Sequence, residues 1–233
     1  MKFFLQAIVL IVLLAGSVIS GMYFDHLWQK EEIQHAELYI YPSEKNFIVP
    51  EEVKKIIKID GDKINNVQVD SLEKILETNE YIQNAEVYRN LNGKLVAEIE
   101  QYKPIARIVG RKSYYIDIDG NEKPLSSHYT ERVVLVFGNL SRERKPEIKK
   151  LLQKIYKDKI LNEIISEIHL KEKDIYLKIN GLKSVVRMKT NEKIEQQLYK
   201  LKIINAYLIK KHLENKYKEI DLRYENQVVC KKK

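Results

Sequence analysis

The fold of the first half of this chain is decided by residues 85–101, AEVYRNLNGKLVAEIEQ. Apolar and polar residues alternate on both sides of Asn92-Gly93, as they do in strands that bury one face. Both turn residues tolerate the positive φ that a tight hairpin turn requires. The segment therefore predicts a β-hairpin, with strands at 85–89 and 94–101 around a turn at 90–93.

One strand and two helices are expected before this hairpin. Residues 37–41 alternate as a strand does. Pro50 suits the first position of a helix, and apolar residues follow it at spacings of three and four. Asp70 is expected to cap a second helix, with Glu73 reaching back to its start, and this helix should end near Asn79. The order strand, helix, helix, strand, strand predicts one helical layer on a three-stranded sheet.

Pro104 is expected to close this unit, because a proline ring cannot donate a hydrogen bond to a strand ladder. A second region rich in strands follows it. We expect a helix from Pro146 and a longer helix capped by Asn191 that runs to about Glu214. The expected strands of this region cover residues 113–118, 133–137, 164–170, 175–179, 184–189, 219–224 and 227–230. The fold class is therefore α+β, with a mixed sheet and two longer helices in the second region.

An uncharged apolar stretch, FFLQAIVLIVLLAGSVISGMYF, fills residues 3–24. As a helix it would be roughly 33 Å long, about the thickness of the hydrocarbon layer of a bilayer. The flanking charges favour a cytoplasmic N-terminus at residues 1–2, a linker at 25–35 and an exported remainder. The sequence thus predicts a single transmembrane helix, and a cleaved secretory signal is the alternative.

Composition and motifs narrow the function. The net charge is +8, but aromatic residues and glycines are not interleaved with the basic ones, which argues against nucleic-acid binding. The single cysteine, Cys230, excludes an intramolecular disulfide and thiolate metal sites. No phosphate-binding loop, dinucleotide fingerprint, nucleophile elbow or paired-histidine zinc motif is present. We therefore expect no catalytic residue, no metal, no cofactor and no small-molecule substrate.

Binding to another polypeptide remains, and the last two expected strands are the most suggestive place for it. A strand near the C-terminus often forms a sheet edge, where unpaired backbone groups can accept a partner strand. The alternative is an edge that Lys231–Lys233 merely protect against aggregation. The pattern leaves both open.

Three local strings, in this order after one apolar segment, resemble the FtsQ/DivIB family of bacterial cell-division proteins. They are Gln101–Arg107 (QYKPIAR), Tyr114–Gly120 (YYIDIDG) with Pro124–Ser126, and Ile220–Tyr224 (IDLRY). The resemblance implies a POTRA domain at 36–104 and a β domain at 105–233. It also implies a single-pass protein of the cell inner membrane, with its C-terminal part in the periplasm and enrichment at the division septum.

The resemblance further implies a scaffold without catalysis that binds FtsB and FtsL and helps recruit and regulate septal peptidoglycan synthesis. The POTRA domain is implicated in contacts with further septal synthesis proteins. The family's last strand receives a segment of FtsB, beside an Arg-Tyr pair that Arg223 and Tyr224 match. The implied partner-binding residues are Arg223, Tyr224, Glu225, Val228 and Val229.

Two other functions were weighed. One is a POTRA-containing envelope chaperone or transport factor that handles exported polypeptides, but such proteins usually carry several POTRA repeats or a barrel-forming tail. The other is an exported enzyme on a membrane tether, for which the sequence offers no convergent acid, base or metal set.

Overall fold

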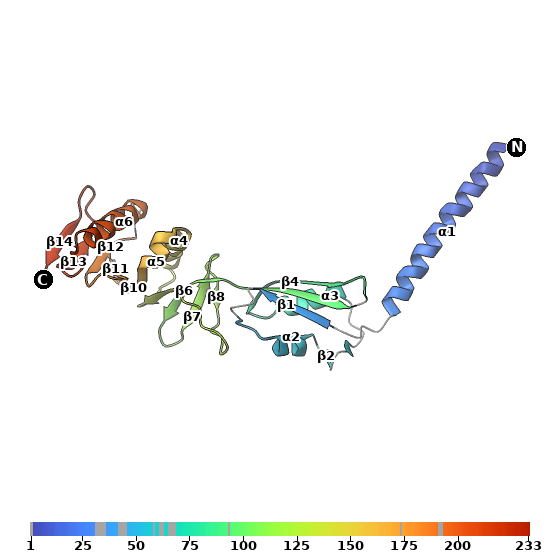
Figure 1. Cartoon of the computed structure of the whole chain (residues 1–233), viewed down its shortest axis with the longest axis horizontal. Coiled ribbons are helices and arrows are strands. Elements are labelled where there is room, and N and C mark those ends of the chain that lie inside the picture. Colours follow the sequence, from blue (N-terminus) through green and yellow to red (C-terminus); the bar gives the residue numbers. More distant parts are fainter. Residues whose placement is uncertain are drawn as a thin grey trace. The chain divides into compact units, whose positions relative to one another are not determined.

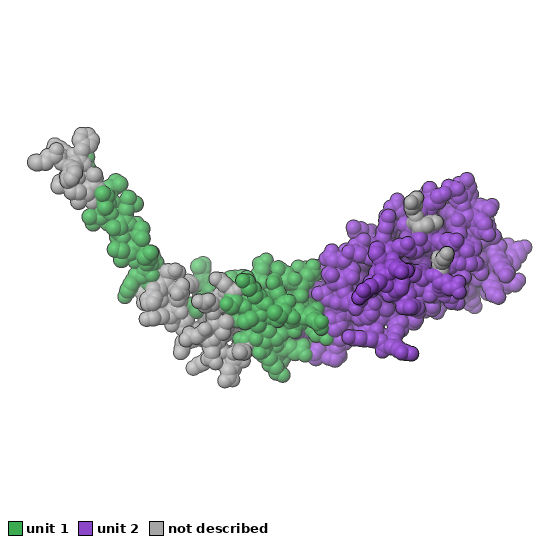
Figure 2. All heavy atoms as spheres, turned by 180° about the vertical axis from the view of Figure 1, so that it is seen from behind, with its two compact units in different colours: residues 1–43, 49–100 green, residues 44–48, 101–233 purple. Residues whose placement is uncertain are grey.

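The structure is a computed structural model, and it describes residues 2–30, 36–41, 46–57, 59–60, 63–64, 69–92, 94–172, 174–190 and 193–233. The chain forms two compact units, coloured separately in Figure 2. Unit 1 contains Met1–Ser43 and Val49–Glu100, and unit 2 contains Glu44–Ile48 and Gln101–Lys233. A short piece between the first strand and the first helix of unit 1 thus belongs to unit 2.

Helix α1 runs from Lys2 to Lys30. Its apolar side chains between Leu10 and Tyr23 are exposed. Within the described residues, no helix combines the length and the apolar character that a membrane crossing requires. The transmembrane helix expected over residues 3–24 is therefore not confirmed.

Unit 1 has the expected βααββ order (Figure 1). Its sheet has the strand order β1-β5-β4, with β1 parallel to β5. Leu95, Ala97 and Ile99 alternate into the buried core that the helices cover. The elements are β1 (Ala36–Tyr41), α2 (Pro50–Ile56), α3 (Val69–Glu77), β4 (Ile82–Arg89) and β5 (Leu95–Gln101), and the short pair β2 (Ile59–Asp60) and β3 (Lys63–Ile64) was not predicted.

Two local predictions in unit 1 need correction or qualification. Helix α3 begins at Val69, so Asp70 lies inside it and is not its cap. Glu73 does not reach back, because its Oε1 accepts a hydrogen bond from the backbone N–H of Val87 at 2.9 Å. The side chain of Asn90 organises the hairpin turn by accepting the N–H groups of residues 92 and 94, while Gly93 lies outside the described residues.

Unit 2 is built on a nine-stranded sheet in the part of the chain that the structure describes, with the order β14-β13-β12-β11-β10-β9-β6-β7-β8. The predicted antiparallel meander is confirmed in β10, β11 and β12. The pairs β6–β9, β9–β10 and β12–β13 are parallel. The strands are β6 (Pro104–Val109), β7 (Tyr114–Asp117), β8 (Glu122–Lys123), β9 (Val134–Phe137), β10 (Ile165–Lys171), β11 (Asp174–Ile179), β12 (Val185–Met188), β13 (Tyr217–Asp221) and β14 (Val229–Lys232).

Three helices pack against this sheet: α4 (Lys145–Lys157), α5 (Lys159–Ile164) and α6 (Ile194–Lys210). Helix α5 was not predicted, although Asp158 caps it by accepting the N–H groups of Ile160 and Leu161. Helix α6 follows Lys193 and ends four residues before the expected Glu214; the expected cap, Asn191, lies outside the described residues. The buried faces of the helices and the inner face of the sheet form one core.

Two strand boundaries in unit 2 differ from the expectation. Unit 1 ends at Glu100, close to Pro104, but strand β6 was not predicted: Pro104 is its first residue, a position where a missing N–H costs little. Strand β13 stops at Asp221, three residues before the expected end at Tyr224. Asp221 Oδ1 accepts the N–H of Arg223 at 3.0 Å, and this local bond turns the backbone away from the ladder.

Candidate partner-binding edge

Strand β14 forms one edge of the nine-stranded sheet. It pairs antiparallel with β13, with Val229 opposite Asp221 and Cys230 opposite Ile220. Its other side has no strand neighbour in the described part of the chain. The backbone groups on that side are therefore available to another strand.

The connection between the two strands, residues 222–228, is held to the body of unit 2 from two sides. The N–H of Leu222 donates to the carbonyl of Arg187 at 2.9 Å, and the Leu222 side chain is fully buried. Lys200 of α6 donates its Nζ to the carbonyls of Leu222, at 2.7 Å, and Tyr224. Burial lowers the pKa of Lys200. The connection thus begins as an anchored segment.

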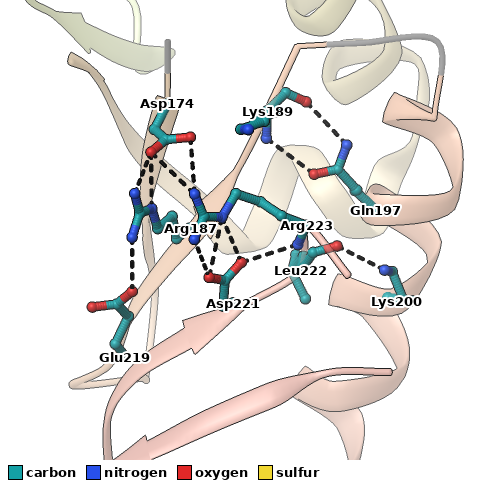
Figure 3. A network of polar contacts seen from close by, with 9 residues as sticks. All are labelled: Asp174, Arg187, Lys189, Gln197, Lys200, Glu219, Asp221, Leu222 and Arg223. Carbon is teal, nitrogen blue, oxygen red and sulfur yellow. Dashed lines mark hydrogen bonds and ion pairs between the residues drawn. The ribbon is translucent and has the colours of Figure 1, made fainter. Parts of the chain in front are cut away.

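Arg223 carries most of this anchoring (Figure 3). Its Nε and Nη2 donate to the carboxylate of Asp221, the latter at 2.6 Å to Oδ2. Its Nη1 lies 3.3 Å from Oδ2 of Asp174 on β11. The guanidinium therefore joins the end of β13 to β11, two strands away in the sheet.

A second arginine completes the network. Arg187 on β12 donates Nε to Asp174 Oδ2 at 3.0 Å, and its Nη1 lies 3.8 Å from Glu219 on β13. Asp174 thus receives two guanidinium groups, one from strand β12 and one from the 222–228 connection. Arg187 also stacks over the ring of Tyr176.

The electrostatics of this cluster follow from burial and pairing. Burial alone would raise the pKa of Asp221, but the hydrogen bonds and charge of Arg223 lower it below the ordinary value. Burial acts the same way on Asp174, and the hydrogen bond from Arg187 with the charges of both arginines lowers its pKa. Hydrogen bonds to Asp221 raise the pKa of Arg223. All three groups are therefore ionised at neutral pH.

The five predicted site residues do not share one role. Arg223 is bound within unit 2, with 22% of its side chain exposed, whereas 46% of Tyr224 is exposed. Glu225 pairs with Lys193 at 2.5 Å on the surface. Val228 packs partly against the core, and Val229 is 41% exposed at the start of β14. Only Val229 lies in the edge strand itself.

Sequence reasoning missed the partners of Arg223. Asp174 lies 49 residues from Arg223 along the chain, and Lys200 lies 22 residues from Leu222. No local pattern connects these positions, because the parallel pairing of β12 with β13 brings them together. The one local signal was the spacing of Asp221 and Arg223, which suits an Asx turn.

No group of three His, Cys, Asp or Glu side chains suited to hold a metal ion occurs among the described residues. Cys230, on β14, is half-buried and unpaired with another cysteine, and burial raises the pKa of its thiol. The cysteine therefore packs as a small apolar residue.

The fold and its free terminal edge define an α+β protein with a sheet edge suited to strand addition. Residues 103–231 match a family model described as FtsQ/DivIB, C-terminal related, and residues 40–100 match the POTRA-like domain. The first match covers more than half of the chain, so the chain belongs to the FtsQ/DivIB-related family of cell-division proteins. Members of this family are typically not enzymes.

Among solved structures, the chain is similar to the major extracytoplasmic domain of the trans isomer of the bacterial cell division protein DivIB from Geobacillus stearothermophilus. The identity is 18% and the TM-score 0.35, over 47% of this chain and 96% of that one. No curated protein shows significant similarity to the chain.

Proposed function

We propose that this protein is a scaffold of the division machinery without catalytic activity. Its exported part binds FtsB- and FtsL-like proteins and so helps to recruit and regulate septal peptidoglycan synthesis. The partner contributes a strand to the free side of β14, next to the 222–228 connection. Membership of the FtsQ/DivIB-related family supports a role in division.

The observation that carries the proposal is the position of β14 at the end of the nine-stranded sheet. Main-chain hydrogen bonds along such an edge give affinity, and neighbouring side chains give specificity. Tyr224 and Val229 are the exposed apolar side chains at the start of this edge. A partner strand would cover both of them and exclude water from the new ladder.

Arg223 has a different part in this proposal from the one its sequence position suggested. Its guanidinium already binds the carboxylates of Asp221 and Asp174. Arg223 therefore holds the connection in place and is not available to bind a carboxylate of a partner. We infer that Arg223 positions Tyr224 for contact. A charge reversal at Arg223 would then reduce partner binding by disturbing the connection.

Attachment to the inner membrane is part of the proposal. The support is the uncharged apolar sequence of residues 3–24 and the exposure of the α1 side chains between Leu10 and Tyr23. The flanking charges favour a cytoplasmic N-terminus and a periplasmic remainder. Retention of the uncleaved chain in carbonate-washed membranes tests this point, and recovery of a shortened soluble chain contradicts it.

Copurification of FtsB and FtsL with the full-length chain tests the binding edge. We expect Tyr224→Asp and Val229→Asp each to reduce the recovered partners roughly ten-fold, because a charge covered at the interface should cost about 1.4 kcal/mol of binding free energy. Tyr156→Asp is the matched control, since Tyr156 is 39% exposed on α4 of the same unit, away from β14. Undiminished recovery with both edge variants would contradict strand addition at β14.

Imaging separates division from the alternative of an envelope chaperone or transport factor, which the POTRA-like match alone would also fit. We expect a fluorescent fusion to gather at midcell in dividing cells. A uniform envelope signal, together with intact partner recovery, would limit the proposal to binding without septal recruitment.

A further inference from the structure

A second surface with a distinct chemistry lies in unit 1, on the face of the three-stranded sheet opposite its buried core. Along β5, Leu95, Ala97 and Ile99 point into the core, so Glu98 and Glu100 point to the opposite face; Val96 shares that face but is 4% exposed and is not part of its surface. The parallel register with β1 places Tyr39 beside Glu98 and Tyr41 beside Glu100. Two neighbouring strands therefore present tyrosines and glutamates side by side.

The third strand extends this surface. The hydroxyl of Tyr88 on β4 donates to Glu98 Oε1 at 2.8 Å, which places Tyr88 on the same face. Glu86, two residues earlier on β4, shares that face and is exposed. The three tyrosines, Tyr39, Tyr41 and Tyr88, are 44%, 49% and 44% exposed. We call this surface the open sheet face; it consists of Glu37, Tyr39, Tyr41, Glu86, Tyr88, Glu98 and Glu100.

The charge of the open sheet face is opposite to that of the whole chain. Four of its seven side chains are carboxylates, and Lys94 reaches it through a 2.7 Å ion pair with Glu37. The chain as a whole carries a net charge of +8. A basic protein of this composition would be expected to have a positively charged surface here, whereas this face is rich in tyrosine and carries a net negative charge.

The side chains of this face select the kind of partner. Carboxylates bind ammonium and guanidinium groups, and tyrosine rings offer apolar area and attract cations to their faces. Phosphate groups of nucleic acids and of anionic lipids would be repelled. We propose that the open sheet face binds a cationic polypeptide segment in which lysines or arginines alternate with apolar residues.

This inference goes beyond the proposed function, because it assigns a second binding surface in a different unit. It shares no residue with β14 or the 222–228 connection. Each can therefore fail without the other. Loss of FtsB and FtsL recovery in the edge variants says nothing about the open sheet face, and the experiment below says nothing about β14.

The test uses the full-length chain in a non-ionic detergent and a fluorescein-labelled synthetic peptide of alternating lysine and leucine. Fluorescence anisotropy measures its binding to the wild type and to the double variant Glu86→Lys/Glu98→Lys. We expect binding roughly ten-fold weaker in the double variant, because two attractive contacts become repulsive. The double variant Glu51→Lys/Glu77→Lys is the matched control: it changes the net charge equally, at exposed positions of α2 and α3.

A second variant tests the rings. Tyr39→Ser/Tyr88→Ser keeps the carboxylates and should weaken binding several-fold if the tyrosines contact the peptide. Circular dichroism confirms that each variant is folded. An equal loss of binding in the two lysine variants would overturn the proposal by showing a general charge effect. Equal binding of a glutamate–leucine peptide would overturn it as well.

Discussion

Two irregular segments of unit 2, residues 46–48 and the 222–228 connection, are both tied down by side chains, but they differ in what they leave exposed. Phe47 and Ile48 are 2% and 0% exposed, whereas Tyr224 is 46% exposed. Gln101 Oε1 accepts both N–H groups of the first segment, at 2.6 and 3.1 Å. Lys200 holds the carbonyls of Leu222 and Tyr224 in the second segment, whose side chains at 224–227 are exposed to solvent.

The first segment is bound by aromatic packing. Phe47 stacks on Tyr102 with ring centroids 4.6 Å apart and meets Tyr115 and Tyr129 edge-on. The hydroxyl of Ser126 donates to the carbonyl of Phe47 at 2.6 Å. The ring of Phe47, its carbonyl and the N–H groups of Phe47 and Ile48 thus all have partners in their own unit, which identifies this pair of residues as structural. The 222–228 connection is fixed in its backbone but exposes its side chains at 224–227, as a binding segment should.

The largest effect is expected from emptying the aromatic cluster. Phe47→Ala should lower the free energy of unfolding by about 4 kcal/mol, because it removes a buried ring and leaves a cavity between three tyrosines. Thermal or urea unfolding of the full-length chain measures it. Phe47→Leu, which keeps most of the apolar volume, should cost about 1 kcal/mol. Equal stability of the wild type and Phe47→Ala would contradict the view that the first segment, unlike the 222–228 connection, serves to stabilise the fold.

The next effect comes from the anchor of the other segment. Arg223→Glu should destabilise the chain by about 3 kcal/mol, because Asp221 loses its guanidinium partner, Asp174 keeps only Arg187, and a third carboxylate is placed beside them. Arg223→Lys should cost less, since it keeps the charge and loses only the planar fork. Unchanged stability in Arg223→Glu would show that Arg223 is free for a partner, as the sequence first suggested.

The pH dependence of stability gives a smaller effect of defined sign. The pKa values of Asp174 and Asp221 are lowered in the folded state. Their contribution is therefore present above the unfolded pKa of about 3.9 and is lost as the pH falls through the folded values. We expect the melting temperature to fall in acid below about pH 4, and to fall less steeply in Arg223→Ala than in the wild type. Parallel acid profiles would contradict this account of the network.

The smallest effect on stability is expected at the exposed side chains. Tyr224→Asp should change the free energy of unfolding by no more than about 0.5 kcal/mol, because its ring contributes little buried area to the folded chain. Its effect should appear in partner recovery instead. A loss of stability as large as that of Arg223→Glu would mean that Tyr224 is a packing residue.

The regular elements were largely readable from the sequence, because their signals are local. The hairpin around residues 90–93 and the meander of β10, β11 and β12 follow from alternation and turn residues. Strand β6 was missed because a proline argues against a strand ladder, although its missing N–H is tolerated at the first residue of a strand. The end of β13 was predicted too late because the alternation of polar and apolar residues continues to Tyr224. In the structure, the carboxylate of Asp221 accepts the backbone N–H of Arg223, and the strand ends at Asp221.

The strings that carried the family resemblance gain a physical meaning in the structure. Tyr102 comes from the first string and Tyr115 and Ser126 from the second, and all three residues contact Phe47. Gln101 adds the hydrogen bonds to its backbone. The motifs therefore record the packing of a buried segment, and they point to the fold more directly than to the binding edge.

By itself the sequence determined the α+β class, most of the helices and strands, and the presence of an apolar N-terminal segment, because each depends on neighbours within about ten residues. Only the tertiary structure decided which strands are parallel, that β14 lies at an edge, and that Arg223 faces inward to Asp174. Those outcomes depend on the energies of contacts between residues far apart in the chain, and a local sequence pattern carries no information about such contacts.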